Sequence, residues 1–143
     1  MTPTLMGRIQ TRIFAIAIIG SLWTLIITPV LPRVEGAPYA MTFSILLVVG
    51  LAGVVWEFLY HLLQQFRWEK DWPTLLGLLT GVNEGLVAWV VVAAGWAPGI
   101  ENGVPLSAFL VHFISTWVVI FLYLNGPMRV PFLRWRFRGG RLL

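Results

Sequence analysis

The sequence contains no cysteine, and only 11% of its 143 residues are charged. Without a thiol, the chain can form no disulfide, no thiolate metal site and no cysteine nucleophile. A soluble domain usually carries about 25% charged residues, so the low charge content excludes an ordinary water-soluble domain. The hydrophobic share of 58% and the mean hydropathy of +0.82 indicate instead that most of the surface faces lipid.

Four apolar stretches are each long enough to cross a bilayer. A hydrocarbon core of about 30 Å requires about 20 residues of helix, and the stretches cover residues 13–31, 39–63, 73–96 and 105–124. Their continuous apolar character excludes a strand barrel, whose strands would alternate. We therefore predict an all-α membrane protein, a four-transmembrane-helix bundle over residues 1–128. A basic, aromatic tail follows over residues 129–143.

The basic residues are distributed unevenly between the two sides of the predicted bundle. Nine of the ten Lys and Arg residues fall on the side that holds the N-terminus, the second loop and the tail, and only Arg33 falls on the other. This count treats Arg8 and Arg12 as charges that flank the first span. Because basic loops stay on the cytoplasmic side of a membrane, we predict a multi-pass plasma-membrane protein with both termini cytoplasmic.

The third apolar stretch contains a GxxxGxxxG motif formed by Gly77, Gly81 and Gly85. Glycines at this spacing share one face of a helix and allow a neighbouring helix to approach closely. Such a motif serves either packing within one chain or dimerisation. We favour packing within the chain, because Glu84 lies on nearly the same face and needs a protein partner.

Polar and ionisable residues lie inside the apolar stretches at Glu57, His61, Asn83, Glu84 and His112. A charge at such depth is costly and is usually paired or functional. At 1.5 Å per residue, Glu84 and His112 lie about 16 Å and about 20 Å from the cytoplasmic side, which is close enough in depth for a pair. Glu57 and His61 are neighbours at positions i and i+4.

Three interpretations of this polar cluster remain open from the sequence. In the structural interpretation, Glu84 pairs with His112 and Glu57 with His61. In the second, His61, Glu57, Glu84 and His112 form a ladder for protons or cations. In the third they bind zinc or iron, although the Glu57-x-x-x-His61 spacing matches neither HExxH nor the Glu-x-x-His of di-iron bundles. We favour the structural interpretation and predict no catalytic residue, no metal and no cofactor.

The C-terminal tail alternates arginines with apolar and aromatic side chains. Its predicted contact residues are Arg129, Arg134, Trp135, Arg136, Arg138 and Arg141. Beside a membrane span this pattern is typical of a segment that lies on anionic lipid. Arginines interleaved with aromatics also suit nucleic acid, but the neighbouring span favours lipid. The expected partners are therefore anionic lipids at the cytoplasmic face and other membrane proteins or further copies of the chain, with no nucleic acid.

Three segments carry a resemblance to a known group of proteins. Residues 56–61 (WEFLYH), residues 67–73 (RWEKDWP) and the ending that starts with NGPMR at residues 125–129 resemble small uncharacterised four-span membrane proteins of actinobacteria. The resemblance implies a bacterial plasma membrane and brings no activity or cofactor with it.

The short loops and the lack of a known enzyme motif argue against a water-soluble active site. We therefore expect a small non-enzymatic scaffold or accessory subunit of a plasma-membrane complex. The alternative is a proton- or cation-coupled transporter or channel that uses the buried Glu/His ladder.

Overall fold

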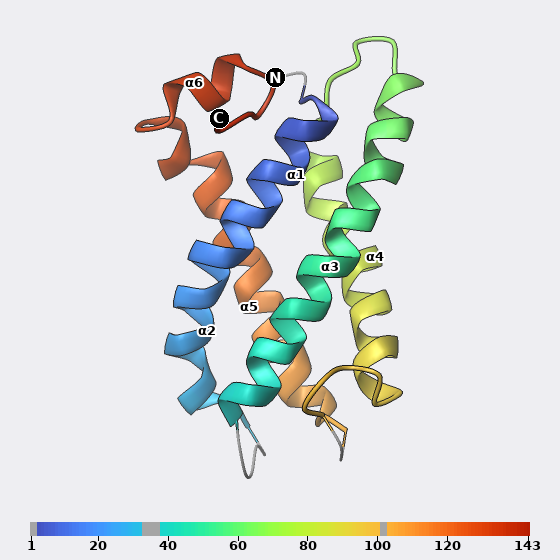
Figure 1. The fold of residues 1–143 in the computed structure, drawn as a ribbon, viewed down its shortest axis with the longest axis vertical. Coiled ribbons are helices and arrows are strands. Elements are labelled where there is room, and N and C mark those ends of the chain that lie inside the picture. Colours follow the sequence, from blue (N-terminus) through green and yellow to red (C-terminus); the bar gives the residue numbers. More distant parts are fainter. Residues whose placement is uncertain (1–2, 33–37, 101–102) are drawn as a thin grey trace.

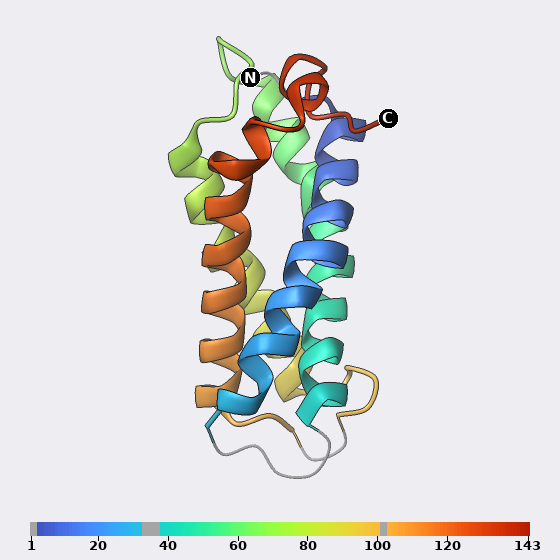
Figure 2. The same ribbon diagram turned by 90° about the vertical axis from the view of Figure 1, so that its left-hand side faces the viewer.

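The computed structural model describes residues 3–32, 38–100 and 103–143. Four long helical segments run side by side along the long axis of the molecule (Figure 1, Figure 2). Among the described residues there is no strand, and four helices are long and apolar enough to cross a membrane. The predicted all-α, four-helix membrane bundle is therefore confirmed.

The first span is built from four consecutive helical segments, and each of the others from one long helix. The segments of the first span are α1 (Leu5–Phe14), the π-helix η1 (Ala15–Gly20), α2 (Ser21–Ile27) and the 3-10 turn η2 (Thr28–Val30). The other spans are α3 (Pro38–Gln65), α4 (Thr74–Ala93) and α5 (Leu106–Asn125), followed by the 3-10 turn η3 (Pro127–Arg129) and the short helix α6 (Leu133–Phe137). Both termini lie at one end of the bundle, called the terminal end below (Figure 1).

The first span begins eight residues earlier than the sequence predicted. Thr4 caps α1, because its side-chain oxygen accepts a hydrogen bond of 3.1 Å from the backbone N–H of Gly7, which satisfies one of the free N–H groups at a helix start. Helix therefore starts at Leu5 rather than near residue 13. As a result Arg8 and Arg12, which we expected to flank the membrane, lie within the helix.

The π-helix η1 changes the register of the first span. Its buried residues are its first and last, Ala15 and Gly20, which are five residues apart, and a π-helix brings residues at i and i+5 into line. The inward face then continues through Thr24 and Thr28, which are buried in turn. Thus one extra residue per turn keeps both Arg12 and Thr24 directed into the bundle.

The apolar core lies towards the end opposite the termini. It is formed where α3, α4 and α5 meet the connection between the last two spans, and its members are Ile45, Val48, Ala88, Val92, Ala97, Ile100, Val104, Ala108, Phe109 and Phe113. The half of the bundle near the terminal end is packed differently, because it contains most of the buried charged side chains. The bundle therefore has an apolar half away from the termini and a half with buried charged side chains near the termini.

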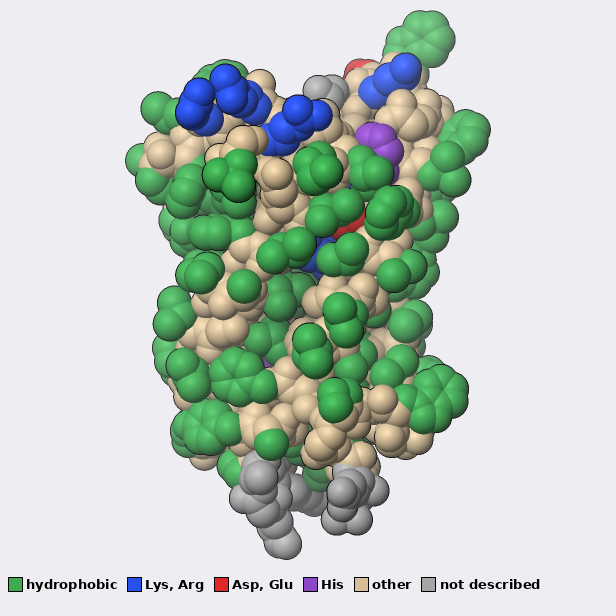
Figure 3. All heavy atoms as spheres, viewed as in Figure 1, with side chains coloured by type: hydrophobic (Ala, Val, Ile, Leu, Met, Phe, Trp, Pro, Cys, Tyr) green, Lys and Arg blue, Asp and Glu red, His purple; other side chains and the backbone are tan. Residues whose placement is uncertain are grey.

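The outer surface is apolar along the sides and basic at the terminal end. Hydrophobic side chains cover the flanks, and Lys and Arg side chains gather beside the termini (Figure 3). Leu51, Val55 and Leu86 are 64%, 70% and 63% exposed, and a continuous apolar surface of this kind is not stable in water. The distribution fits a multi-pass protein whose flanks contact lipid.

The C-terminal tail folds back over α1 and covers part of the terminal end (Figure 1). The indole Nε1 of Trp135 donates to the Thr11 hydroxyl at 2.6 Å, and that hydroxyl donates to the Gly140 carbonyl at 2.9 Å. Trp135 is buried, which corrects the expectation that it contacts lipid or a partner. The surrounding arginines of the tail are exposed, namely Arg129, Arg134, Arg136, Arg138 and Arg141.

Candidate functional site

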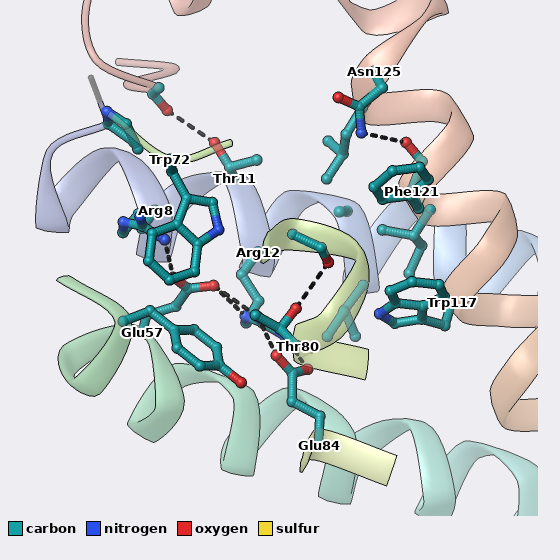
Figure 4. A pocket seen from close by; sticks show the side chains of 18 of the residues that line it. Arg8, Thr11, Arg12, Glu57, Trp72, Thr80, Glu84, Trp117, Phe121 and Asn125 are labelled. Atoms are coloured by element: carbon teal, nitrogen blue, oxygen red, sulfur yellow. Dashed lines mark hydrogen bonds and ion pairs between the residues drawn. The ribbon is translucent and has the colours of Figure 1, made fainter. Parts of the chain in front are cut away.

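A network of charged side chains joins the first three spans in the half of the bundle near the terminal end. Arg12 on α1 is its centre (Figure 4). Its Nη1 and Nη2 donate to the two carboxylate oxygens of Glu84 on α4, at 2.7 and 2.8 Å. Its Nε donates to Oε1 of Glu57 on α3 at 2.8 Å, and Nη2 lies 2.7 Å from the same oxygen. One guanidinium therefore binds both buried carboxylates.

Arg8 extends the network by one helical turn towards the terminal end. Its Nη1 donates to Oε2 of Glu57 at 3.2 Å, and its Nε and Nη2 donate to the side-chain oxygen of Gln64 at 3.1 and 2.8 Å. The guanidinium also lies 4.5 Å from the ring centroid of Trp72, a distance at which a cation is attracted to the ring face. The Gln64 amide in turn donates to the Lys70 carbonyl at 2.6 Å, which ties the network to the second loop.

The network is balanced in charge and shielded from the surroundings. Glu57, Glu84 and Arg8 are only 7%, 3% and 8% exposed, and Arg12 completes two positive and two negative groups. Paired carboxylates and guanidinium groups with this fork geometry form strong hydrogen bonds. Removing one partner would leave an uncompensated buried charge, which is far more costly than the intact pair.

The pairings expected from the sequence are not the ones that form. Glu84 pairs with Arg12 rather than with His112, and the Nε2 of His112 lies 2.9 Å from the hydroxyl of Thr24 instead. Glu57 pairs with Arg8 and Arg12 rather than with His61. The physical reason is that a guanidinium offers five donors in a planar fork, whereas a neutral imidazole offers one.

Two members of the expected polar cluster lie outside the network. His61 is half-buried at the edge of α3, where its Nε2 lies 3.4 Å from the side-chain nitrogen of Gln65. Asn83 is exposed on the outer face of α4, because one residue along an α-helix turns the side chain by about 100° from Glu84. Only Glu57, Glu84 and His112 are buried as expected.

Arg8, Arg12 and Gln64 are the network residues that the sequence analysis missed. A signal was present, because two carboxylates within apolar stretches require cations, and Arg8 and Arg12 are spaced by four residues at the start of the first stretch. Residues at i and i+4 share one helix face. The early helix start at Leu5 is what brings them inside.

A cavity of about 520 Å³ adjoins the network and is lined by residues of all four spans. Its lining extends from Asn125 near the terminal end of α5 to His112 near the middle of that helix. The labelled side chains in Figure 4 show Trp117 and Phe121 on the opposite side of the cavity from the charged network. The cavity thus has one charged wall and one aromatic wall.

Three polar atoms buried in the lining of this cavity have no hydrogen-bond partner among the described residues. One is the hydroxyl of Tyr60 on α3, and the other two are Nδ1 of His112 and Oγ1 of Thr116, which lie one helical turn apart on α5. Most buried polar atoms in proteins are hydrogen-bonded. The two atoms on α5 therefore mark a part of the cavity that can accept a small polar molecule or water.

The glycine motif of α4 packs against aromatic rings of α5. A Cβ atom added at Gly81 would overlap the indole of Trp117, and one added at Gly85 would lie 2.7 Å from the ring of Phe113. Gly77 is less crowded, with Phe121 at 4.0 Å. The motif therefore positions the aromatic wall of the cavity from within the same chain.

Metal chemistry finds little support in this arrangement. Nowhere in residues 3–32, 38–100 and 103–143 do three His, Asp or Glu side chains come together in a group that could hold a metal ion. The two buried carboxylates are instead engaged by arginine.

No protein-family model, no curated protein and no solved structure matches this chain, so no relative contributes to the assignment of the site.

Proposed function

We propose that this protein is a small, non-enzymatic scaffold or accessory subunit of a complex in the bacterial plasma membrane, with both termini in the cytoplasm. The observation that carries the proposal is the pairing of both buried carboxylates, Glu57 and Glu84, with Arg8 and Arg12. Their charges are used to hold three spans together. Neither carboxylate is left free to exchange a proton with a substrate or to bind a cation.

The terminal end supplies a surface suited to a protein partner. Trp68 and Phe66 in the second loop are 99% and 81% exposed, and large aromatic side chains are enriched at the centres of protein interfaces. The exposed arginines of the tail surround the same end of the molecule. In the proposed orientation these arginines also lie where they attract anionic lipid.

Affinity purification of the full chain in a mild detergent tests the role as a subunit. We expect a membrane protein to co-purify in stoichiometric amount with the wild type and to be lost with Trp68→Ser. The matched control is Trp96→Ser at the opposite end, where the side chain is 74% exposed, and it should retain the partner. A wild-type protein that purifies alone, or equal loss with both variants, would contradict the proposal.

A proton- or cation-coupled transporter or channel is the second candidate function, and the cavity is the observation that favours it. The cavity reaches from the terminal end past Glu57 and Glu84 to His112, which offers an access route from one side of the membrane. Against this function, His61 is not part of the lining, so the expected ladder is interrupted. The fixed positive charge of Arg12 would also repel a cation.

Proton flux into liposomes containing the purified protein separates the two functions. On the scaffold proposal, the wild type should give no more flux than empty liposomes. A flux that Glu84→Gln abolishes would overturn it, because an amide cannot exchange a proton at neutral pH. The matched control is Glu69→Gln, which removes an exposed carboxylate from the second loop and should leave any flux unchanged.

A further inference from the structure

Asn83 places an amide on the outer face of α4, halfway across the membrane. It is nine positions after Thr74 and ten before Ala93, which leaves about 14 Å of helix on either side at 1.5 Å per residue. Its side chain is exposed, and Gly81 and Ala88 are buried on the opposite face of the same helix. In a bilayer core of about 30 Å, this amide faces the hydrocarbon.

Lipid offers this amide no hydrogen-bond partner. Several polar side chains on the inward faces of the spans have protein partners: Thr24 bonds to His112 at 2.9 Å, and Ser115 accepts from the Trp23 indole at 2.9 Å. No such bond joins Asn83 to a residue that the structure describes. An unpaired amide in hydrocarbon costs free energy, and a polar side chain on a neighbouring span removes that cost.

The apolar residues on the Asn83 face repeat with the spacing of a coiled coil. Positions separated alternately by three and four residues are Leu76, Leu79, Asn83, Leu86, Val90 and Ala93. This is the alternation of the a and d positions at which two helices interlock. Leu79, Leu86 and Val90 are 51%, 63% and 59% exposed, so none of the described elements covers the stripe at these three positions.

We propose that the Asn83 stripe of α4 is an interface with a second copy of this chain, in which the two Asn83 amides hydrogen-bond to each other. Two copies inserted in the same orientation carry Asn83 at the same depth, so a two-fold axis along the membrane normal brings the amides together. An amide has both donors and an acceptor, so the pair is reciprocal. The same patch is used on both copies, which closes the assembly at two subunits.

A single polar residue at an a position fixes the register and the number of helices that associate, and Asn83 occupies that position here. The stripe is separate from the charged network and the cavity, which lie on the inward face of α4. Dimer formation can therefore be tested independently of the proposed scaffold and transporter functions.

Cysteine cross-linking tests the interface directly, because the chain has no cysteine of its own. Purified Leu86→Cys protein in vesicles of phosphatidylethanolamine and phosphatidylglycerol should form a covalent dimer on oxidation. The matched control is Ile114→Cys, at a similar depth on the outer face of α5 and 52% exposed, which should remain mainly monomeric. Equal cross-linking of the two variants would overturn the proposal.

The role of the amide itself is measured by the monomer–dimer equilibrium. Energy transfer between two labelled populations, followed as the lipid-to-protein ratio rises, gives the dissociation constant of the dimer. Asn83→Leu should weaken the dimer by about tenfold, as expected for an interhelical hydrogen bond of this kind, and Asn83→Gln should restore part of the loss. The Tm of both variants should match the wild type under conditions where all are monomeric, because the Asn83 side chain is exposed and forms no hydrogen bond with a described residue.

Two results would sink the proposal. One is a dimer whose dissociation constant is unchanged by Asn83→Leu. The other is a wild-type protein that stays monomeric in vesicles while Leu86→Cys cross-links to a different protein in native membranes, because the occupant of the stripe would then be another chain.

Discussion

Arg12 and Glu84 lie 72 positions apart in the sequence and are joined by two hydrogen bonds of 2.7 and 2.8 Å in a fork-to-fork arrangement. The same guanidinium binds Glu57, so α1, α3 and α4 meet at a single side chain. In a membrane the apolar side chains of neighbouring helices gain little by leaving lipid. The contacts that specify how helices associate must therefore be polar or closely packed, and Arg12 supplies the polar kind.

Replacing Arg12 should destabilise the protein strongly. Arg12→Leu leaves Glu84 without a counter-charge and Glu57 with Arg8 alone, and breaking a buried pair in this way costs about 3–5 kcal/mol. Equilibrium unfolding in mixed detergent micelles measures the loss. The informative control is the double variant Arg12→Leu with Glu84→Leu, which leaves the Arg8–Glu57 pair neutral and should recover most of the stability. If the double variant is no more stable than Arg12→Leu alone, the network is not the source of the effect.

The sequence was sufficient to predict the fold, because the apolar length of a span depends on local composition alone. The four spans and their order follow from hydropathy and from the turn residues between them. The start of the first span did not follow, because Arg8 and Arg12 lower the local hydropathy. Whether an arginine flanks a span or lies within it depends on whether a buried carboxylate on another helix can pair with it. That pairing is a property of the tertiary structure.

The site was only partly predictable for the same reason. Glu57, Glu84 and His112 were recognised as buried, because each interrupts an apolar run. Their partners lie on other helices, and the rotation of each helix decides which side chains meet. The π-helix η1 shifts the face of the first span by one residue, and regular helical spacing gives no sign of that shift. Asn83 and Glu84 are adjacent in sequence, yet one faces lipid and the other faces Arg12.

The orientation in the membrane can be checked by labelling single cysteines in intact cells. With Arg8 and Arg12 assigned to the network, the remaining basic residues still favour the terminal end, so we expect that end to be cytoplasmic. Trp68 is 99% exposed at that end, so Trp68→Cys should be protected from an impermeant thiol reagent. Trp96 is 74% exposed at the opposite end, so Trp96→Cys should react with the same reagent. The reverse pattern would invert the topology.

Thr24 and Thr116 form a matched pair for testing hydrogen bonding around His112. Thr24→Val removes the hydroxyl that lies 2.9 Å from Nε2 of His112 and leaves a buried ring without that partner, at a cost of about 1–3 kcal/mol. Thr116→Val removes a hydroxyl that has no partner among the described residues, so its effect on stability should be close to zero. Thermal unfolding in detergent compares the two. A lower Tm for Thr116→Val than for Thr24→Val would mean that Oγ1 of Thr116 holds a molecule bound in the cavity.

Gly81 and Gly77 belong to one motif but should differ in their tolerance of a side chain. The Cβ of Gly81→Ala would overlap the Trp117 indole, so the ring must move, and overpacking of this kind costs about 1–3 kcal/mol. Gly81→Leu should be more severe still. At Gly77 the nearest atoms to a new Cβ are 3.9 Å away, so Gly77→Ala should be neutral or slightly stabilising, because alanine favours helix over glycine by up to about 1 kcal/mol. Thermal stability in detergent decides the matter, and equal Tm values for the two alanine variants would show that α4 and α5 are not in close contact at Gly81.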